Sequence, residues 1–369
     1  MTEWRYIAAK LDGAGGMEFL EYDLRLDDVE VHQVLNGHGG LTAKIPHEQA
    51  HLRAKGRPVF EPWSTAIFAE ASGIIRGGGI LTDLSEDGPA LALDCVGFTG
   101  YLADMPYTNI RSIERDDPLK ISRHLWEHTQ ARRGFDLGVE FAGASSSREM
   151  FVGDPDVEPS TTPIKVDPLV LAYWETHDLA REFDHLAELA PFEYRMEHAW
   201  DGETIRHRLR YGYPTLGARR HDLRFVVGEN VLVEPEVETA GEGYASHVLV
   251  LGAGEGRSMM RSPDMSTPTD RLGRFAVVSD KTITTPAQAK ARAEAELKAR
   301  TGTSDITEIQ VIQHPHTPLG SYQVGDEIAL TTAGGWTDET DLWVKVLGQV
   351  IRPGTDTTTL QVRRAEKVN

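Results

Sequence analysis

A β-rich stretch near the start of the chain has the same layout as a stretch near its end. The two copies are residues 74–96 and residues 343–362. In each copy a β-rich segment has a glycine, Gly79 or Gly348, before an aliphatic pair, and a turn then leads into a strand that alternates between two faces. The predicted turns are Asp87-Gly88 and Pro353-Gly354. A β-unit that is used twice, with other material between the copies, is more typical of an architectural protein than of a single catalytic pocket.

The length and charge of the chain limit the classes of protein to which it can belong. Its 369 residues exceed the usual size of one domain and predict two to four domains. With 38 Lys and Arg against 57 Asp and Glu, the net charge is −19, which argues against a protein that holds nucleic acid by neutralising its phosphates. Such a charge fits an acidic soluble surface, and it also fits a conduit through which DNA slides without being retained.

Cysteine content and the N-terminus bear on the compartment. The single cysteine, Cys95, lies within an apolar predicted strand, so we expect no internal disulfide and a thiol that packs as a small core side chain. Residues 1–5 lack a basic start that is followed by an apolar run, and no apolar stretch of about 18 residues occurs. We therefore expect a protein that is made and folded in the cytoplasm and has no membrane-spanning segment.

The first part of the chain predicts a β-barrel or a β-sandwich. Short apolar or alternating runs follow one another, and clusters of Gly, Asn and Asp such as residues 36–40 separate them. The predicted strands are residues 19–26, 29–31, 41–45, 66–69, 73–81 and 91–96.

The composition changes after these strands, where helices are predicted. Asp117-Pro118 supplies an N-cap and a proline for the first helical position, and the helix should run to about Arg132. A polar stretch at residues 143–162 predicts an exposed loop, and a second helix follows it. The apolar face of that second helix consists of Leu179, Phe183, Leu186 and Ala190. The two helices are expected to form a small domain between two β-parts.

Alternation with period two returns at residue 192. Residues 192–196 and 205–211 flank Asp201-Gly202, which is the strongest hairpin signal in the sequence. Thr285-Pro286 then begins a helix that ends near residue 302. The other predicted strands are residues 223–227, 231–233, 247–251, 309–311, 322–324, 328–330, 342–351 and 358–362. The predicted order is therefore β, α, β, short helix, β.

Residues 124–128, His-Leu-Trp-Glu-His, match the H-x-x-E-H pattern of inverted zinc peptidases. On a helix this spacing places His124 and His128 one turn apart, with Glu127 beside them. The pattern still needs a further carboxylate ligand, which the sequence does not identify. Ile121 and Leu125 share the face of the two histidines, so the alternative is that these histidines edge a packing stripe.

Three further patterns have plain structural alternatives. Residues 252–256 look like a dinucleotide-binding loop, but the third glycine comes one residue early and no helix follows, so a glycine-rich turn is predicted. His314-Pro315-His316 has no Cys or acidic cluster beside it in the sequence and is interpreted as a loop. Two acidic groups are candidates for glycosidase carboxylates or for ordinary turn residues. They are Asp83, Glu86 and Asp87, and Asp338, Glu339 and Asp341.

Two basic groups stand out in this acidic chain. The first alternates along a predicted strand, so its three arginines share one face and the intervening residues share the other. The arginines are Arg206, Arg208 and Arg210, and the opposite face is Ile205, His207, Leu209 and Tyr211. The second group is Arg219-Arg220-His221. The strand face is either a solvated surface or a contact to an acidic neighbouring subunit.

Four segments in succession carry a family resemblance. They are residues 66–81, residues 121–130, the helix of residues 279–300, and residues 320–328. In this order they resemble the minor tail proteins of siphophages that infect actinobacteria, and within these proteins the chain looks like the tail hub, or baseplate hub. The resemblance spans about residues 60–362.

The resemblance implies a fold and an assembly. Such hubs are similar to the central hub of contractile-tailed phages and to the spike-complex hub of secretion systems, which implies a homotrimer whose subunits each contribute two tube-like β-barrel domains. Six similar barrels would then match a sixfold tail ring to a threefold tip. No catalytic residue, cofactor or metal ligand belongs to the hub pattern, so none is assigned. The expected fold class is mainly β with α, an α+β multidomain chain with a small helical domain and an insertion.

Domain boundaries follow from the resemblance and the predicted elements. The expected parts are a first tube-like β-barrel domain at 1–115, a helical domain with a polar loop at 116–191, a second tube-like β-barrel domain at 192–251 plus 303–369, and an inserted segment with a short helix at 252–302.

The function expected from the sequence is that of a non-enzymatic virion protein at a phage tail tip. It would join the distal tail tube to the tip, line the channel for genome ejection, and adapt threefold to sixfold symmetry. Its expected partners are two further copies of itself, the distal tail protein or tail tube ring, the tape measure protein and other tip proteins, while DNA passes without specific binding.

Two alternatives belong to other functional classes. The first is a zinc-dependent peptidase or cell-wall hydrolase that uses His124, Glu127 and His128. The second is a carbohydrate-binding tail module, for which Trp336 and Trp343 are the candidate aromatic residues.

Overall fold

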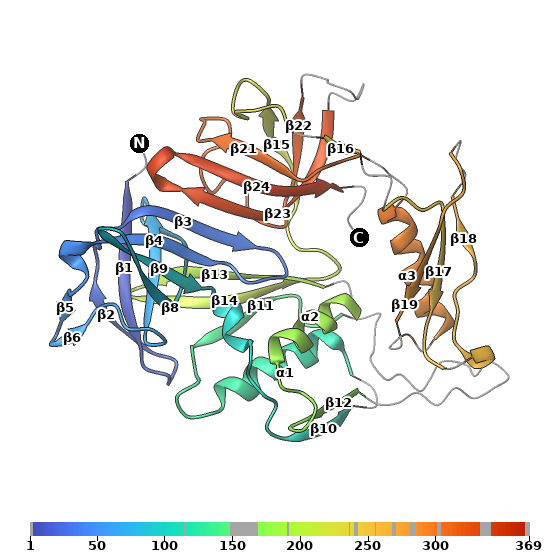
Figure 1. Cartoon of the computed structure of the whole chain (residues 1–369), viewed down its shortest axis with the longest axis horizontal. Helices are drawn as coiled ribbons and strands as arrows, with labels where there is room; N and C mark the ends of the chain where they lie inside the picture. The colour runs from blue at the N-terminus through green and yellow to red at the C-terminus, as the bar shows by residue number, and fades with distance from the viewer. Residues whose placement is uncertain are drawn as a thin grey trace.

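The described part of the chain folds into a mainly β structure with three α-helices and several sheets, as the sequence predicts. The computed structural model describes residues 3–113, 116–147, 169–189, 192–235, 237–239, 243–254, 256–267, 271–280, 283, 285–300, 304–332 and 341–365. Figure 1 shows the N-terminal strands in blue, the helices α1 and α2 below them, the C-terminal strands in red, and a small orange α/β unit to one side. The predicted order of β, α, β, short helix, β is confirmed.

Seven N-terminal strands form the larger part of a 12-stranded sheet, in the order β3-β4-β9-β8-β7-β1-β2. Two short strands, β5 and β6, form a separate ladder. The strands are β1 (Trp4–Leu11), β2 (Met17–Glu21), β3 (Asp27–Val34), β4 (Gly40–Pro46), β5 (Arg53–Ala54), β6 (Arg57–Pro58), β7 (Thr65–Ala71), β8 (Ile74–Asp87) and β9 (Ala90–Val96). Sequence analysis misses β1 because this strand is buried on both faces, so the alternation that marks a half-buried strand is absent; Ile7, Ala8 and Ala9 are all fully buried.

The central part holds two helices and a three-stranded sheet of order β11-β14-β13. The predicted N-cap is confirmed, since the Asp117 carboxylate accepts a hydrogen bond from the Leu119 amide at 3.0 Å. The predicted hairpin around Asp201-Gly202 is β13 with β14. The elements are β10 (Ile110–Ile113), α1 (Pro118–Gln130), β11 (Val139–Gly143), β12 (Leu169–Ala172), α2 (Leu179–Leu189), β13 (Glu193–Asp201) and β14 (Thr204–Gly212). The predicted loop at 143–162 lies mostly outside the described residues, as does Ala190.

The C-terminal strands continue the N-terminal sheet. They are β15 (Arg219–Val226), β21 (Glu308–Ile312), β22 (Glu327–Thr331), β23 (Asp341–Arg352) and β24 (Thr357–Arg364). Strand β23 pairs antiparallel with β3, with Gly348 opposite Val34 and Ile351 opposite Val31. Both copies of the repeated layout are hairpins in this one sheet, β8 with β9 and β23 with β24, and each contains a register shift of the β-bulge kind.

A small α/β unit is attached through a two-stranded stem. Strands β16 (Val237–Thr239) and β20 (Ser304–Ile306) pair with each other at the base. Above this stem, β17 (His247–Leu251), β18 (Met265–Ser266) and β19 (Phe275–Ser279) form a sheet that is covered on one face by α3 (Pro286–Arg300). Thr285 caps α3 as predicted, because its hydroxyl accepts from the Gln288 amide while the Gln288 side chain accepts from the Thr285 amide. Strand β17, which the predicted boundaries put in the second β-domain, thus pairs with β18 and β19; the division into four domains stays a prediction.

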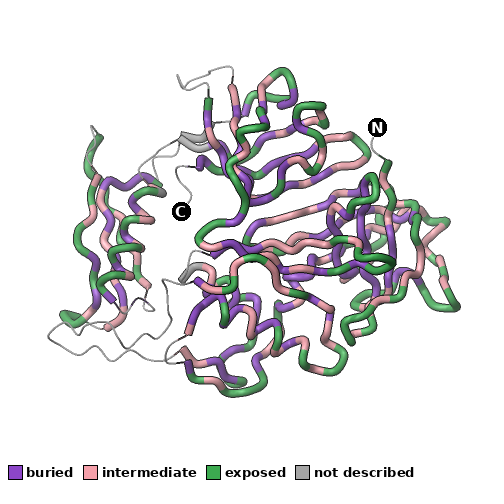
Figure 2. The backbone as a smooth tube through the Cα atoms, turned by 180° about the vertical axis from the view of Figure 1, so that it is seen from behind, coloured by how far each residue is buried: buried purple, intermediate pink, exposed green. Residues whose placement is uncertain are grey.

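The N-terminal sheet packs on both of its faces. Along β7, Ala66 and Phe68 contact a cluster that includes Trp126 of α1 and Leu209 of β14. The alternate residues Ile67 and Ala69 contact a second cluster that includes Leu41 of β4. Figure 2 shows the resulting concentration of buried residues in the centre of the body. The C-terminal strands and the α/β unit each have a cluster of their own.

Three local predictions are wrong. Residues 322–324 form no strand; they cross the C-terminal core as a loop in which Tyr322 and Val324 are buried. Residues 231–233 likewise form no strand, because a tight turn precedes them. The hairpin of β8 with β9 turns at Gly88-Pro89, so the acidic residues before this turn lie in strand β8 and not in the turn. Asp87 of β8 pairs with Ala90 of β9 on the two sides of the turn, so both strands extend beyond their predicted ends.

Candidate functional site

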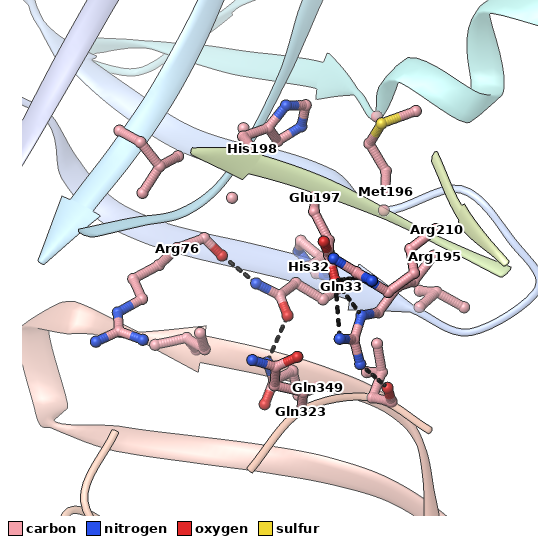
Figure 3. A pocket seen from close by; sticks show the side chains of 18 of the residues that line it. His32, Gln33, Arg76, Arg195, Met196, Glu197, His198, Arg210, Gln323 and Gln349 are labelled. Atoms are coloured by element: carbon pink, nitrogen blue, oxygen red, sulfur yellow. Dashed lines mark hydrogen bonds and ion pairs between the residues drawn. The ribbon is translucent and has the colours of Figure 1, made fainter. Parts of the chain in front are cut away.

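A cleft among the described residues lies where the N-terminal and C-terminal strands meet the β13–β14 hairpin. It has a volume of about 510 Å³ and is lined by β3, β8, β13, β23 and the loop at residues 319–324. In Figure 3 the side chain of Glu197 points from β13 toward the C-terminal strands, and those of Met196 and His198 point to the opposite side. The cleft therefore lies at the joint that sets the relative position of the N-terminal and C-terminal strands.

Two glutamines connect three strands across this joint. Gln349 of β23 lies directly opposite Gln33 of β3, and its amide nitrogen donates to the Gln33 side-chain oxygen at 2.6 Å (Figure 3). The Gln33 amide nitrogen in turn donates to the backbone carbonyl of Arg76 in β8. Because both amides are partly buried, each of these hydrogen bonds avoids the cost of an unpaired polar group. The amide chain holds the sheet together where its two halves meet.

A three-residue charge network lines the cleft beside the glutamines. Glu197 Oε1 accepts hydrogen bonds from Arg195 Nε at 3.0 Å and from Arg210 Nε at 2.8 Å. Burial by itself favours the neutral carboxyl, but the hydrogen bonds and positive charges of Arg210 and Arg195 outweigh it and lower the pKa of Glu197. Arg195 also donates to the Val324 carbonyl at 2.8 Å, so the network reaches the loop between β21 and β22. The charges hold this loop against β13.

Arg76 presents a different situation in the same cleft. Its Nε is buried and has no hydrogen-bond partner among the described residues. Burial lowers the pKa of Arg76, as expected for a cation that is removed from water. The guanidinium lies against Gly320, where any added Cβ would clash with it. The lining of the cleft thus offers amides and guanidinium groups, with Glu197 already occupied by two arginines.

A pair of histidines lies on the other side of β13, of which His207 is buried and His198 is half-buried. His198 Nδ1 and His207 Nδ1 are 2.8 Å apart, so one ring donates a proton and the other accepts it. Phe98 contacts both rings, and Phe68 stacks on His207 at a centroid distance of 5.6 Å. Burial lowers the pKa of His198 to about 4 and lowers that of His207 well below its ordinary value. Both rings are therefore neutral at pH 7.

Of the charged and amide side chains described in this cleft, the sequence patterns single out only Arg210, as part of the basic stripe. One signal was present in the predicted hairpin, where Arg195 lies directly opposite Arg210. Two arginines that face each other across strands repel unless an acid lies between them, and Glu197 is that acid. The contributions from Gln33, Gln349 and residue 324 carry no such signal, because they come from strands and loops that are distant in sequence.

Among the described residues, no third metal ligand converges on the two histidines of the H-x-x-E-H helix. Tyr107 Oη lies 3.0 Å from His124 Nε2, and the Thr108 amide donates to His128 Nε2 at 3.2 Å. Burial and the adjacent Arg132 guanidinium, which lies 3.2 Å from His128 Nε2, lower the pKa of His128 to about 4. The Arg132 guanidinium beside His128 Nε2 disfavours the binding of a metal ion at the same nitrogen. The Glu127 side chain is exposed. The two histidines instead pack against Tyr107, at the edge of the helix.

The glycine-rich turn predicted after β17 is confirmed. The Gly252 amide donates to the Met260 carbonyl and the Met260 amide to the Ala253 carbonyl, both at 2.7 Å. A side chain at residue 252 would clash with the Ile283 carbonyl, so the glycine permits a close approach of this chain's own backbone. Directly after this turn the described residues form a single 3₁₀ turn, η3 (Gly256–Ser258), and not the helix of a dinucleotide-binding loop.

The other 3₁₀ turns among the described residues are η1 (His47–Gln49), η2 (Phe98–Leu102) and η4 (Pro353–Thr355).

The acidic groups and the tryptophans do not form sites among the described residues. Asp87 pairs with Lys44 at 3.3 Å, and Asp341 accepts from the Thr331 hydroxyl at 2.7 Å. Asp338, Glu339 and Trp336 lie outside the described residues. Trp343 is covered by the Arg219 guanidinium, 4.7 Å from its ring centroid. Among the described residues, Tyr173 and Trp174 form a pair of exposed aromatic side chains that the sequence patterns do not single out.

The arginine stripe of β14 has the predicted geometry and finds its acidic partners within the chain. The opposite face, with Ile205, His207, Leu209 and Tyr211, is buried. Arg206 Nε lies 2.6 Å from Asp201, and Arg208 Nε lies 3.5 Å from Glu140 of β11. In the second basic group, Arg219 pairs with Glu327 and Arg220 with Asp222, each at 2.6 Å. Exposed pairs of this kind add little stability, but they show that the stripe needs no neighbouring subunit for charge balance.

Comparisons with known proteins detect a likeness in structure only. No model of a known protein family matches the chain, and no curated protein matches its sequence. Among solved structures, the chain is similar to the 43 kDa tail protein of prophage MuSo2 from Shewanella oneidensis, with a TM-score of 0.62 at 11% identity over 98% of both chains. It is also similar to a tail protein from Neisseria meningitidis, with a TM-score of 0.59 at 14% identity over 99% of this chain and 98% of the other. A third similar structure is the prophage tail protein gp18 from Listeria monocytogenes, with a TM-score of 0.57 at 13% identity over 98% of this chain and 95% of the other. Over almost its whole length, this chain has the fold of phage tail proteins.

Proposed function

We propose that the protein is a structural, non-enzymatic component of a phage tail and serves as the hub that joins the distal tail tube to the tail tip. The observation that carries this proposal is the similarity to three tail proteins, two of them from prophages, over at least 98% of the chain. The family proposed from the sequence, the hub of siphophages that infect actinobacteria, is one member of this wider class. We further propose that the protein resides in the virion after its synthesis in the host cytoplasm.

The joined sheet supports a role in matching symmetries. The hairpins β8–β9 and β23–β24 have similar layouts and belong to one sheet, because β23 pairs with β3. Three copies of such a chain would present six similar hairpins around an axis, which is the number needed to contact a sixfold tube ring from a threefold tip. We propose that the domains at 1–115 and at 192–251 plus 303–369 are the two tube-like modules. The buried polar joint between them would keep the six positions fixed.

The charge of the chain supports a passage that DNA crosses without binding. Its net charge of −19 repels phosphates at long range. The basic residues that the sequence analysis singles out are neutralised by carboxylates of the same chain, as at Arg206 and Arg220. None of the helices in the described ranges is long and apolar enough to cross a membrane. The proposed partners are two further copies of the chain, the distal tail protein or tube ring, the tape measure protein and other tip proteins.

The enzymatic alternative receives no support from the site geometry. A zinc peptidase needs both imidazoles of its helix directed at one ion. Here His128 Nε2 lies against a guanidinium and a backbone amide. The proposed function therefore includes no catalytic step.

The test of the proposal begins with the oligomeric state. Light scattering of the purified chain should give three times the 40.8 kDa of one chain, and a stable dimer or hexamer would contradict the threefold design. A chain that remains a monomer in solution is then examined on the particle. Gold-labelled antibodies against the chain should bind the distal end of the tail in negative-stain images, and labelling of the capsid or of the tube along its length would overturn the hub assignment.

A further inference from the structure

A cluster of two histidines and a glutamate lies on the C-terminal module, away from the cleft. His316 Nδ1 lies 3.1 Å from Glu229 Oε1, and His314 Nε2 lies 4.0 Å from the same oxygen. The two imidazole rings are 4.8 Å apart with an interplanar angle of 74°. One ligand atom from each of the three side chains lies within 4.8 Å of the others, and the described residues contain no second group of three that converges in this way. Sequence analysis interprets His314-Pro315-His316 as a loop without acidic neighbours; the fold supplies Glu229 from 85 residues earlier.

Hydrogen bonds of Asn230 join the two turns that carry these side chains. Asn230 is buried, with 1% of its surface exposed, and its side-chain amide donates to the Thr317 hydroxyl at 3.0 Å. The same side chain accepts from the Val226 amide at 2.7 Å, which closes the turn that contains Glu229. The backbone of Asn230 also accepts from the Ile312 amide at 3.0 Å. Glu229 and the two histidines therefore lie on a backbone that is fixed before any ligand arrives.

We propose that Glu229, His314 and His316 bind a divalent transition metal ion of the zinc class. Imidazole nitrogens with one carboxylate oxygen form a usual donor set for such an ion, and they suit Mg²⁺ poorly. Metal–ligand bonds of about 2.1 Å with tetrahedral geometry place neighbouring ligand atoms about 3.4 Å apart. The separations of 3.1 and 4.0 Å from Glu229 Oε1 are within about 1 Å of that edge length, and all three ligand atoms lie within 4.8 Å of one another. Small side-chain rotations then complete three of the four coordination positions.

The surroundings define what kind of site this is. The His316 and Glu229 side chains are 73% and 46% exposed, so an ion has direct access and the fourth position opens to solvent. His314 Nδ1 accepts a hydrogen bond from the His316 amide at 3.3 Å. When His314 Nε2 binds the metal, the ring proton must lie on Nδ1, so metal binding breaks this one weak hydrogen bond. The site is thus an open three-ligand site, of the kind that keeps a water or accepts a ligand from another chain.

Calorimetric titration of the full-length, tag-free protein with zinc chloride tests the proposal directly. We expect one ion per chain, with no competition from excess magnesium chloride. Glu229→Gln and His316→Ala should each weaken zinc binding at least tenfold, and the double variant His314→Ala/His316→Ala should abolish it. The double variant His124→Ala/His128→Ala is the matched control, since it removes the same number of imidazoles from the unassembled H-x-x-E-H helix and should bind zinc like the parent protein.

Cobalt provides a second readout that does not depend on any variant. Co²⁺ bound at three protein ligands with an open position should give visible absorption bands that zinc displaces. Zinc binding that is unchanged in His314→Ala/His316→Ala, or lost in His124→Ala/His128→Ala, would overturn the proposal, as would the absence of any binding by the parent protein. Circular dichroism of each variant confirms that the fold is retained. The outcome is independent of whether the protein is a trimer.

Discussion

Lys345 Nζ lies 2.6 Å from Glu193 Oε1 and 2.7 Å from Glu193 Oε2, in an ion pair that joins β23 to the start of β13 across 152 residues of sequence. Both side chains are buried, with 2% and 9% of their surfaces exposed. Glu193 also accepts from the Leu216 amide at 2.6 Å. Desolvation of the carboxyl is the largest effect and raises the pKa of Glu193 although the ammonium opposes it. The pair fixes the hairpin β13–β14 to the C-terminal module, next to the glutamines of the cleft.

Removal of one partner of this ion pair should be strongly destabilising. Lys345→Met leaves a buried carboxylate without its cation and should lower the free energy of unfolding by about 3–5 kcal/mol. Glu193→Gln leaves a buried ammonium and should cost a similar amount. The double variant should lose much less than the sum of the single losses, because the introduced side-chain amide keeps an acceptor for the Leu216 amide and no charge is left buried. Chemical denaturation of the four proteins measures this coupling, and additive single effects would show that the pair is not coupled.

The histidine pair predicts a loss of stability in mild acid. The unfolded chain binds a proton on each ring near pH 6.5, whereas the folded chain resists protonation of His198 down to about pH 4. Because the folded-state pKa is lowered, the unfolded state takes up more protons as the pH falls from about 6.5 to 4, and the free energy of unfolding decreases over that window. His198 alone accounts for at most about 3 kcal/mol, and His207 acts in the same direction. Denaturation midpoints measured between pH 4 and pH 7 check the slope.

The variant His198→Gln separates this effect from the titration of surface groups. Glutamine can still exchange a hydrogen bond with His207 but does not titrate, so the variant should show a shallower loss of stability in the same pH window. Its stability at pH 7 is expected to fall as well, because the contact with Phe98 is lost. Equal slopes for the variant and the parent protein would assign the acid sensitivity to other groups.

Asp117 should stabilise the folded protein more than an ordinary helix cap does. Besides the Leu119 amide at 3.0 Å, its carboxylate accepts from the Ser147 amide at 2.8 Å and from the hydroxyls of Ser146 and Ser147. Burial alone would raise the pKa of Asp117, but these donors together lower it. Asp117→Ala should therefore destabilise the protein by about 2–3 kcal/mol, above the typical value of about 1 kcal/mol for a cap. Ser146→Ala, which removes one of the donors, is the milder comparison, and an equal loss in both variants would contradict the prediction.

A close approach of two backbones explains a glycine before β15. Gly217 has a φ of +92°, and a Cβ there would lie 2.3 Å from the carbonyl carbon of Gly325. Gly217→Ala must therefore strain the backbone and also separate two segments that meet through the hydrogen bond from the Glu327 amide to the Ala218 carbonyl. Gly228 has a φ of +82° with no atom within 4 Å of the added Cβ, so Gly228→Ala isolates the strain alone, about 1–2 kcal/mol. Thermal unfolding should show a clearly larger loss for Gly217→Ala, and equal losses would refute the steric part of the argument.

Local patterns in the sequence determined most of the elements of this protein. The cap at Asp117, the capping box at Thr285, the hairpin at Asp201-Gly202 and the repeated hairpins all rest on residues that are close in sequence, and each is present in the structure. Strand β1 lacks the alternation of a half-buried strand because it is buried on both faces. Residues 322–324 alternate like a strand although they form a loop, because a loop that crosses a core also exposes and buries residues in turn.

Tertiary structure alone decided which of these elements meet. The pairing of β23 with β3, the ion pair of Glu193 with Lys345 and the convergence of Glu229 with His314 and His316 each join segments that are far apart in the chain. The periodicity of a sequence does not predict these contacts between distant segments, because such contacts depend on sheet order and loop direction and not on the spacing of residues. The same reason explains why the H-x-x-E-H spacing misleads. A helix brings two imidazoles to one face, but the groups packed around that face, here Tyr107, Thr108 and Arg132, decide whether a metal can bind there.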